Sequence, residues 1–286
     1  MVAAARLRRA QDRAVACRPY VKKMREVLKD VAIHSRNRNH PLLLQRTDDK
    51  ILYLVVSADK GLAGAYTSNV LREAVSHISA SGHAALVVTG RKGRDYFKRH
   101  DYSIAKAFIG LSERPRFEDA SQIAQELFAG YAAGEYNQVY VVYTHFYSPM
   151  NQKPMTTKLL PLDIEGVTFG TAEDAEDADE DDDEDGFLQD LGFGDEKGDA
   201  YDTYIIEPSP ADVLTRLLPR YLEAVVYEAL LQSAASELGA RMTAMGSATT
   251  NAQDIISELT LNYNKVRQSA ITREISEIVG GVEALQ

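Results

Sequence analysis

Two glycine-containing turns are the first places in this chain where residue spacing is suited to chemistry. Residues 57–64, Ser-Ala-Asp-Lys-Gly-Leu-Ala-Gly, follow an apolar run and precede a stretch with helical spacing. A turn of this kind in an α/β protein can hold phosphate at the start of the next helix. However, the spacing matches neither the dinucleotide fingerprint nor the phosphate loop, so we interpret it as structural. Residues 90–93, Gly-Arg-Lys-Gly, receive the same interpretation.

Metal and nucleophilic chemistry find little support in the residue pattern. The histidines occur singly, without metal-ligand spacing: His34, His40, His77, His83, His100 and His145. The single Cys17 falls on an apolar stripe, and we expect a buried thiol in a reducing compartment. Residues 181–188 resemble part of a calcium loop, but Gly192 stands where a bidentate Glu is needed. The sequence therefore predicts no catalytic residue, metal site or cofactor.

A more specific pattern is a polar group near the C-terminus. Arg267, Gln268 and Glu274 lie within a long stretch of helical spacing, near its end. A plain coiled coil would not need such a particular set of polar residues at its tip. A tip that docks into a socket would, so this group is a candidate binding site for a partner protein.

The elements that must position this tip are two long helical stripes, one at each end of the chain. In both, small or apolar residues recur at alternating steps of four and three, the coiled-coil period. The C-terminal stripe is Leu238, Met242, Met245, Thr249, Ala252, Ile256, Leu259, Tyr263, Val266 and Ala270. The N-terminal stripe is Ala3, Leu7, Ala10, Ala14, Cys17, Val21, Met24, Leu28 and Val31. Two such stripes can pair antiparallel, which predicts a long rod.

The ends of these helices can be placed from capping signals. Residues 1–36 are predicted to form the first helix, with a local kink at Pro19. Ser209 is the predicted N-cap of the last helix, followed by Pro210, and Asp212 completes a capping box. The pattern then continues to Val279, a helix of about 105 Å.

The middle of the chain changes period and predicts an α/β domain. Short apolar runs predict strands at residues 51–56, 84–88, 103–109 and 139–143, with sheet-edge members at 154–160 and 201–206. Helical spacing falls between them at 67–78, 94–100 and 117–133. The predicted fold class is therefore α/β: a long antiparallel coiled coil of the terminal helices plus a Rossmann-like domain with a mostly parallel sheet. The domain boundaries are 1–36, 48–207 and 209–286.

Charge is distributed unevenly along the chain. Its net charge is −10, yet residues 171–200 alone hold fifteen acidic residues against one lysine. We expect this low-complexity insertion to be disordered. The first 38 residues carry eleven Arg or Lys against three acids. A basic rod suits an acidic partner; nucleic acid is disfavoured because no zinc spacing, basic zipper or aromatic basic sheet motif is present. No run of about 18 apolar residues exists that could span a membrane.

Several motifs together resemble the gamma subunit of F-type ATP synthases, in a bacterial form. The most specific lie in residues 240–252 and 263–279, including Tyr263-Asn264 and Arg267-Gln268. Residues 1–11 and 18–20 are similar to its N-terminal helix, and residues 57–64 to the start of its α/β domain. Residues 159–162, 207–208 and 217–221 match the return to the rod. The resemblance covers essentially the whole chain except residues 171–200.

The resemblance implies a rotating central stalk that couples proton flow through the membrane ring to ATP synthesis or hydrolysis on beta subunits. It implies no catalysis by the chain itself and no cofactor. The implied partners are one hexamer of alpha and beta subunits, the epsilon subunit and the c-ring, with one copy of this chain per complex, on the cytoplasmic side of the cell membrane. The implied beta-subunit contacts are Arg241, Arg267, Gln268, Thr272 and Glu274; the implied contacts at the foot, toward epsilon and the ring, are Tyr204, Ile205, Ile206 and Glu207.

Two departures and two alternatives accompany this prediction. Family members carry further helical turns before the segment that begins at Met1, so the resemblance implies that Met1 is an internal start or the result of a truncation. The acidic insertion lies where the chloroplast form has its redox segment, here without cysteine. The insertion is a tolerated loop or one that modulates rotation through charge.

The first alternative function is an α/β phosphate- or nucleotide-binding enzyme dimerised through its terminal helices, which would bind ATP or NAD. The second is a self-associating coiled-coil scaffold.

Overall fold

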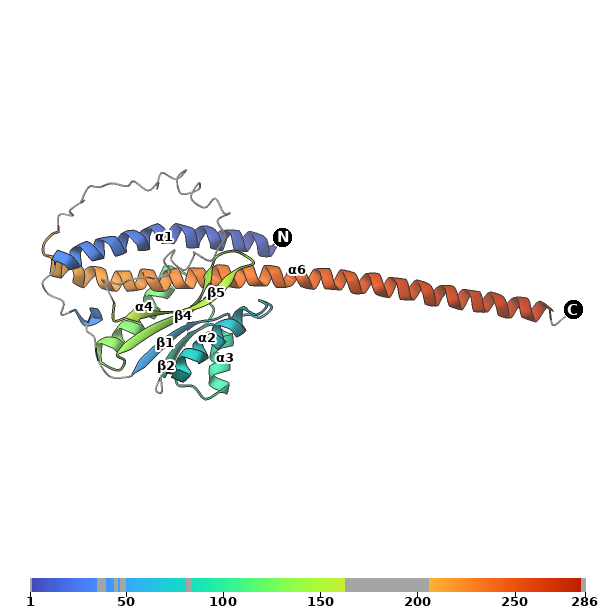
Figure 1. Ribbon diagram of the computed structural model, residues 1–286, viewed down its shortest axis with the longest axis horizontal. Helices are drawn as coiled ribbons and strands as arrows, with labels where there is room; N and C mark the ends of the chain where they lie inside the picture. The colour runs from blue at the N-terminus through green and yellow to red at the C-terminus, as the bar shows by residue number, and fades with distance from the viewer. Residues whose placement is uncertain are drawn as a thin grey trace, which may run out of the picture.

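Two helices of very different length dominate the molecule. The computed structural model describes residues 2–34, 40–43, 46, 50–80, 84–162 and 206–283. Helix α1 (Val2–His34) lies antiparallel beside the first part of α6 (Pro210–Glu283), a helix of 74 residues (Figure 1). At 1.5 Å per residue, α6 is about 110 Å long and α1 about 50 Å. We call this pair the shaft.

The α/β domain is built on a five-stranded sheet of order β3-β2-β1-β4-β5. Its strands are β1 (Ile51–Val56), β2 (Ala84–Thr89), β3 (Ile104–Phe108), β4 (Gln138–Phe146) and β5 (Gln152–Leu160). The pairs β1–β2, β1–β4 and β2–β3 are parallel, whereas β5 pairs antiparallel with β4 at the edge. The mostly parallel sheet predicted from the alternation of strands and helices is thus confirmed.

The side chains of β1 show how the sheet is covered on both faces. Tyr53 and Val55 point to one face, where they pack with α2 (Tyr66–Ala80) and α3 (Arg91–Arg99). Leu52, Leu54 and Val56 point to the other, where α4 (Phe117–Ala132), the short 3-10 turn η1 (Pro41–Leu43) and the shaft cover them. Alternation along the strand therefore joins the sheet and the shaft in one apolar core.

Helix α6 lies between α1 and the α/β domain over its first half (Figure 1). Consequently it is buried nearly all round: of residues 221–241, only Glu223, Tyr227, Glu228 and Ala240 are not fully buried. On α1, the predicted stripe is buried at Leu7, Ala10, Ala14, Val21, Met24, Leu28 and Val31. Gly239 allows the β4–β5 turn to approach, because a Cβ there would lie 2.9 Å from Gln152 Nε2.

The antiparallel pairing of the two terminal helices is confirmed, with a limited overlap of the predicted stripes. Of the C-terminal stripe, Leu238 and Met242 pack with Leu7 and Ala10. The rest of the stripe is exposed. The reason is length: the 33 residues of α1 reach no further along the 74 residues of α6. The seam that α1 covers lies earlier, and includes Leu214 and Leu218.

The start of α6 agrees with the predicted capping box. Ser209 Oγ accepts a hydrogen bond from the Asp212 backbone N–H at 3.2 Å and donates to the Asp212 carboxylate at 2.6 Å. Helix α1 is continuous through Pro19, so the proline does not interrupt it. Of the predicted sheet member at residues 201–206, the structure describes Ile206, which is not in a strand. Residues 201–205 and the acidic insertion, residues 171–200, lie outside the described residues.

Candidate functional site

The second half of α6 stands clear of the rest of the described structure. We call residues 245–283 the α6 extension; it is about 60 Å long and projects alone in Figure 1. Within residues 245–278, every residue is exposed except Asn264, which is half-buried. Its backbone is nonetheless a regular helix, with small hydroxyl side chains such as Thr272 bonding the preceding turn (Oγ1 to Gln268 O, 2.9 Å).

The α6 extension exposes an unusual amount of apolar surface. Its large apolar side chains are between 42% and 72% exposed: Met245, Ile255, Ile256, Leu259, Leu261, Tyr263, Val266, Ile271, Ile275 and Ile278. A soluble monomer rarely presents so many apolar groups along one element, and a continuous apolar surface of this kind indicates an interaction site. The α6 extension is therefore built to be covered by a partner.

Four of the five predicted contact residues for the beta subunits lie together on this element. Arg267, Gln268, Thr272 and Glu274 are all exposed and fall within two turns of helix. A shallow surface depression beside them is lined by Val266, Ala270 and Glu274, among others. The structure thus leaves this group accessible on α6, and its contact with a partner stays a prediction.

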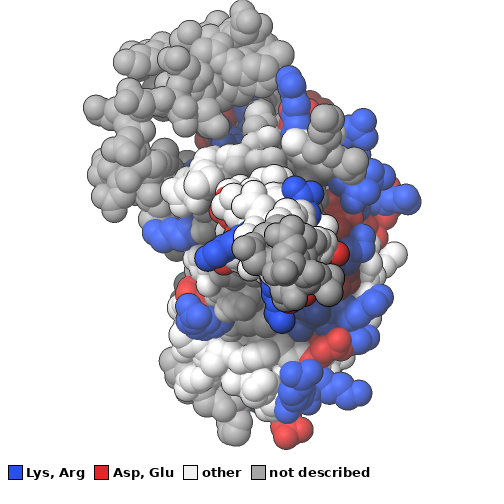
Figure 2. All heavy atoms as spheres, turned by 90° about the vertical axis from the view of Figure 1, so that its right-hand side faces the viewer, with Lys and Arg blue, Asp and Glu red and all other residues white. Residues whose placement is uncertain are grey.

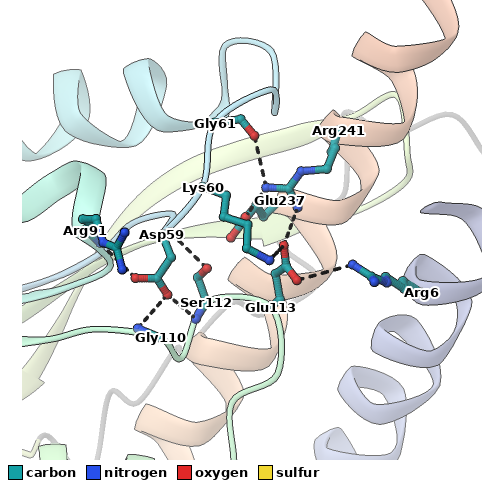
Figure 3. A network of polar contacts seen from close by, with 10 residues as sticks. All are labelled: Arg6, Asp59, Lys60, Gly61, Arg91, Gly110, Ser112, Glu113, Glu237 and Arg241. Carbon is teal, nitrogen blue, oxygen red and sulfur yellow. Dashed lines mark hydrogen bonds and ion pairs between the residues drawn. The ribbon is translucent and has the colours of Figure 1, made fainter. Parts of the chain in front are cut away.

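Arg241 is placed differently from the other four. Its side chain is only 9% exposed and its Nη2 lies 2.5 Å from Glu237 Oε1, one turn earlier on α6 (Figure 3). The same Nη2 also donates to the Gly61 backbone oxygen at 3.4 Å, and Nη1 lies 3.5 Å from Glu113 Oε1. Arg241 therefore acts within the chain, where α6 leaves the α/β domain.

Glu113 connects three separate parts of the molecule at this point. Its carboxylate lies 3.1 Å from Lys60 Nζ, in the turn after β1, and 3.5 Å from Arg6 Nη1 on α1 (Figure 3). Together with Arg241, these contacts link α1, α6 and the loops of the α/β domain. We call this set, Arg6, Lys60, Glu113, Glu237 and Arg241, the charge network; it fixes the root of the α6 extension.

Burial determines the electrostatics of the charge network. Glu237 is completely buried, which raises the pKa of its carboxyl group, while the hydrogen bond and charge of Arg241 oppose the rise. A buried carboxylate needs its cationic partner, because removing the partner leaves an uncompensated charge. Sequence reasoning missed both Glu113 and Glu237: neither lies in a motif, and Glu113 is far from Arg241 in sequence.

The carboxylate of Asp59, in the turn at residues 57–64, lies at the start of α3, where a phosphate could otherwise bind. Asp59 accepts backbone N–H groups from Arg91, Gly110 and Ser112 at 2.9 to 3.1 Å (Figure 3). Although burial opposes it, these bonds lower the pKa of Asp59. Since Asp59 already takes the first N–H of α3, the structural interpretation of the turn at residues 90–93 fits the geometry. Gly90, with φ +88°, is required because a Cβ there would lie 2.2 Å from Ser57 O.

The remaining predicted residues lie at the other end of the shaft. Ile206 packs against the apolar core and Glu207 is exposed, just before α6 begins. Tyr204 and Ile205 lie outside the described residues. Cys17 is a partly buried free thiol; burial, with a contribution from Glu228, raises its pKa to about 12, so the thiol stays protonated at neutral pH.

The described residues contain neither a candidate metal site nor a candidate membrane span. No group of three or more His, Cys, Asp or Glu among them could hold a metal ion. None of the described helices is long and apolar enough to cross a membrane. The arrangement as a whole defines a class: an elongated subunit with a small α/β domain, whose long projecting helix is made for a protein socket.

Comparison with known proteins identifies the family within this class. Residues 1–285 match the sequence model of a protein family that is described as ATP synthase. The chain is 43% identical to the ATP synthase gamma chain of Pelotomaculum thermopropionicum over 287 residues, and 43% identical to that of Heliobacterium modesticaldum over 286; each alignment covers 100% of this chain and 91% of the relative. The fold is shared with a chain of the Tetrahymena thermophila mitochondrial ATP synthase central stalk and c-ring structure, with TM-score 0.59 and 24% identity, covering 87% of this chain and 96% of that one.

The chain therefore belongs to the ATP synthase gamma family. Its curated relatives are ATP synthase gamma chains, and the long projecting helix belongs to a fold that it shares with a chain of a central-stalk structure.

Proposed function

We propose that this chain is the non-catalytic rotating shaft of a bacterial ATP synthase, coupling ion flow through a membrane ring to ATP synthesis or hydrolysis on beta subunits. The observation that carries the proposal is the α6 extension, whose residues 245–278 are exposed apart from Asn264. A helix of about 60 Å with one anchored end is shaped to reach into another assembly. Its exposed apolar side chains need a complementary surface, which a ring of alpha and beta subunits would supply.

Specific contact residues follow from the same geometry. Arg267, Gln268, Thr272 and Glu274 would contact beta-subunit loops, because they are exposed on the part of α6 furthest from the α/β domain. Arg241, which is paired within the chain, would position the α6 extension rather than bind a beta subunit itself. Ile206 and Glu207, with Tyr204 and Ile205, would lie at the foot, toward the epsilon subunit and the ring.

The cellular setting follows from the family. The chain would be one copy in a complex with the alpha and beta hexamer, epsilon subunit and c-ring, held peripherally on the cytoplasmic side of the cell membrane. Family membership and the likeness to a central-stalk chain support this setting. Against the competing enzyme function, Asp59 takes the first N–H of α3, where a phosphate would otherwise bind.

Co-expression with the alpha and beta subunits tests the proposal. We expect a stoichiometric complex on size exclusion that hydrolyses ATP, whereas the chain alone shows no ATPase activity. Changing both Arg267 and Gln268 to Ala should lower the ATPase rate of the assembled complex. The matched control is Gln253→Ala, which alters an exposed residue of the α6 extension outside this group. ATP hydrolysis by the purified chain alone, or failure to assemble, would contradict the proposal.

A further inference from the structure

A small hollow lined by arginines lies where α1, α6 and the loop after β3 meet. Its volume is about 110 Å³, and Arg6, Arg9, Arg13 and Arg114 line it. The first three are spaced three and four residues apart on α1, so they share one face of that helix. Arg114 borders the hollow from the loop after β3. Four arginines from two separate elements, all of them exposed, thus line one small space.

The charge in this hollow is not balanced by the chain. Its acidic lining residue is Glu113, which already contacts Lys60 and Arg241 as well as Arg6. Among the described residues, Arg9, Arg13 and Arg114 form no ion pair. Basic side chains also predominate along one side of the molecule when it is viewed toward the end of α6 (Figure 2). Convergence of like charges is unfavourable, and a bound anion would relieve it.

The floor of the hollow limits what kind of anion fits. It is formed by the buried apolar residues Ala10, Leu231, Ala234 and Leu238. The side chains of these four residues carry no hydrogen-bond acceptor that would compete for the guanidinium groups. The volume of 110 Å³ is well below the roughly 300–1,000 Å³ of sites for nucleotide-sized ligands. A compact oxyanion, by contrast, matches the planar fork of arginine with two parallel hydrogen bonds.

We propose that this hollow binds inorganic phosphate. The anion would bridge Arg9 and Arg13 of α1 to Arg114 of the α/β domain, beside the charge network. Bound phosphate would then cross-link the N-terminal half of α1 to the α/β domain, beside the root of the α6 extension. This inference is independent of the proposed rotor function, because it concerns the isolated chain.

The test is isothermal titration of the purified full chain with inorganic phosphate, at constant ionic strength balanced with sodium chloride. Expected is one site with a Kd of about 1 mM or tighter. Changing Arg9 and Arg13 together to Gln should weaken binding at least about tenfold, because charge-assisted hydrogen bonds are lost. Arg114→Gln probes the site from the loop and should also weaken binding. Arg8→Gln, which alters an exposed arginine of α1 outside the hollow, should leave binding unchanged.

Three results would overturn the proposal. The first is phosphate binding no stronger than the chloride background, or weakened equally by Arg8→Gln, since either shows only general charge attraction. The second is ATP binding much more tightly than phosphate at the same residues, which would make the site a nucleotide site. The third is phosphate binding that appears only after deletion of residues 171–200, which would show that an acidic peptide, not phosphate, occupies the hollow. Circular dichroism and thermal unfolding of each variant confirm that it is folded.

Discussion

The buried ion pair at the root of the α6 extension leads to the sharpest stability prediction. Arg241→Met removes the cation that faces Glu237, whose side chain is 1% exposed. Breaking a buried pair by deleting one partner costs about 3–5 kcal/mol, because the remaining charge is uncompensated. We expect a loss of that size in the free energy of unfolding, measured for the purified chain by urea denaturation at pH 8.

The same helix provides a matched control. Arg273 and Glu277 also form a pair four residues apart on α6, with 3.0 Å between Arg273 Nε and Glu277 Oε1, but their side chains are 83% and 67% exposed. Exposed pairs of this kind contribute about 0–1 kcal/mol, so Arg273→Met should change stability by no more than that. A second variant, Glu237→Gln with Arg241→Met, leaves no buried charge and should recover much of the loss.

The pH dependence of Arg241→Met adds an independent check. Burial already raises the pKa of Glu237, and without Arg241 that pKa rises further. A carboxyl group whose pKa is raised on folding binds more protons in the folded state, so stability falls as pH increases above its unfolded value of 4.5. The loss caused by Arg241→Met should therefore be larger at pH 8 than at pH 5. An equal, small loss for Arg241→Met and Arg273→Met at both pH values would refute the reasoning.

Three further predictions concern the rest of the fold. Leu218→Ala removes a completely buried side chain of the shaft core and should lower the free energy of unfolding in urea by about 2–5 kcal/mol. Leu261→Ala, at a 72% exposed position, should lower it by less than about 0.5 kcal/mol. Similar losses at both positions would contradict the burial assigned to them. Gly90→Ala should cost at least about 1–3 kcal/mol by the same measurement, since φ is +88° and the new Cβ would lie 2.2 Å from the Ser57 backbone oxygen; an unchanged midpoint would refute the steric argument. Asp59→Asn should lower stability at pH 7 and flatten the decline of stability in acid. A carboxyl group with a lowered native pKa contributes stability above its ordinary pKa of 3.8, and this contribution is lost as pH falls through the native pKa. Urea midpoints of the variant that fall between pH 5 and pH 2 as steeply as those of the unchanged chain would argue against that role.

Much of the fold is visible in local sequence patterns. The short apolar runs at residues 51–56 and 84–88 correspond to β1 and β2, because strands buried on both faces have few polar positions. The N-cap at Ser209 was predictable since the capping box is a short-range signal. The pattern around Arg267 selected residues that are exposed on α6, and their role as contacts stays a prediction.

What could not be predicted depends on contacts between distant residues. The coiled-coil period shows which face of α6 is apolar but not how much of that face α1 covers, because the overlap depends on how the two helices are set against the domain. The buried position of Arg241 depends on Glu113 and Gly61, which are far from it in sequence.

Rotation of the chain inside the assembled complex is the most direct test of its role. Lys98→Cys, combined with Cys17→Ser, places one reactive thiol on the exposed face of α3 for attachment of a bead. With the alpha and beta subunits fixed to a surface, adding ATP should turn the bead continuously in one direction. A complex that contains the chain and hydrolyses ATP while the bead stays still would contradict the assignment of this chain as the rotating shaft.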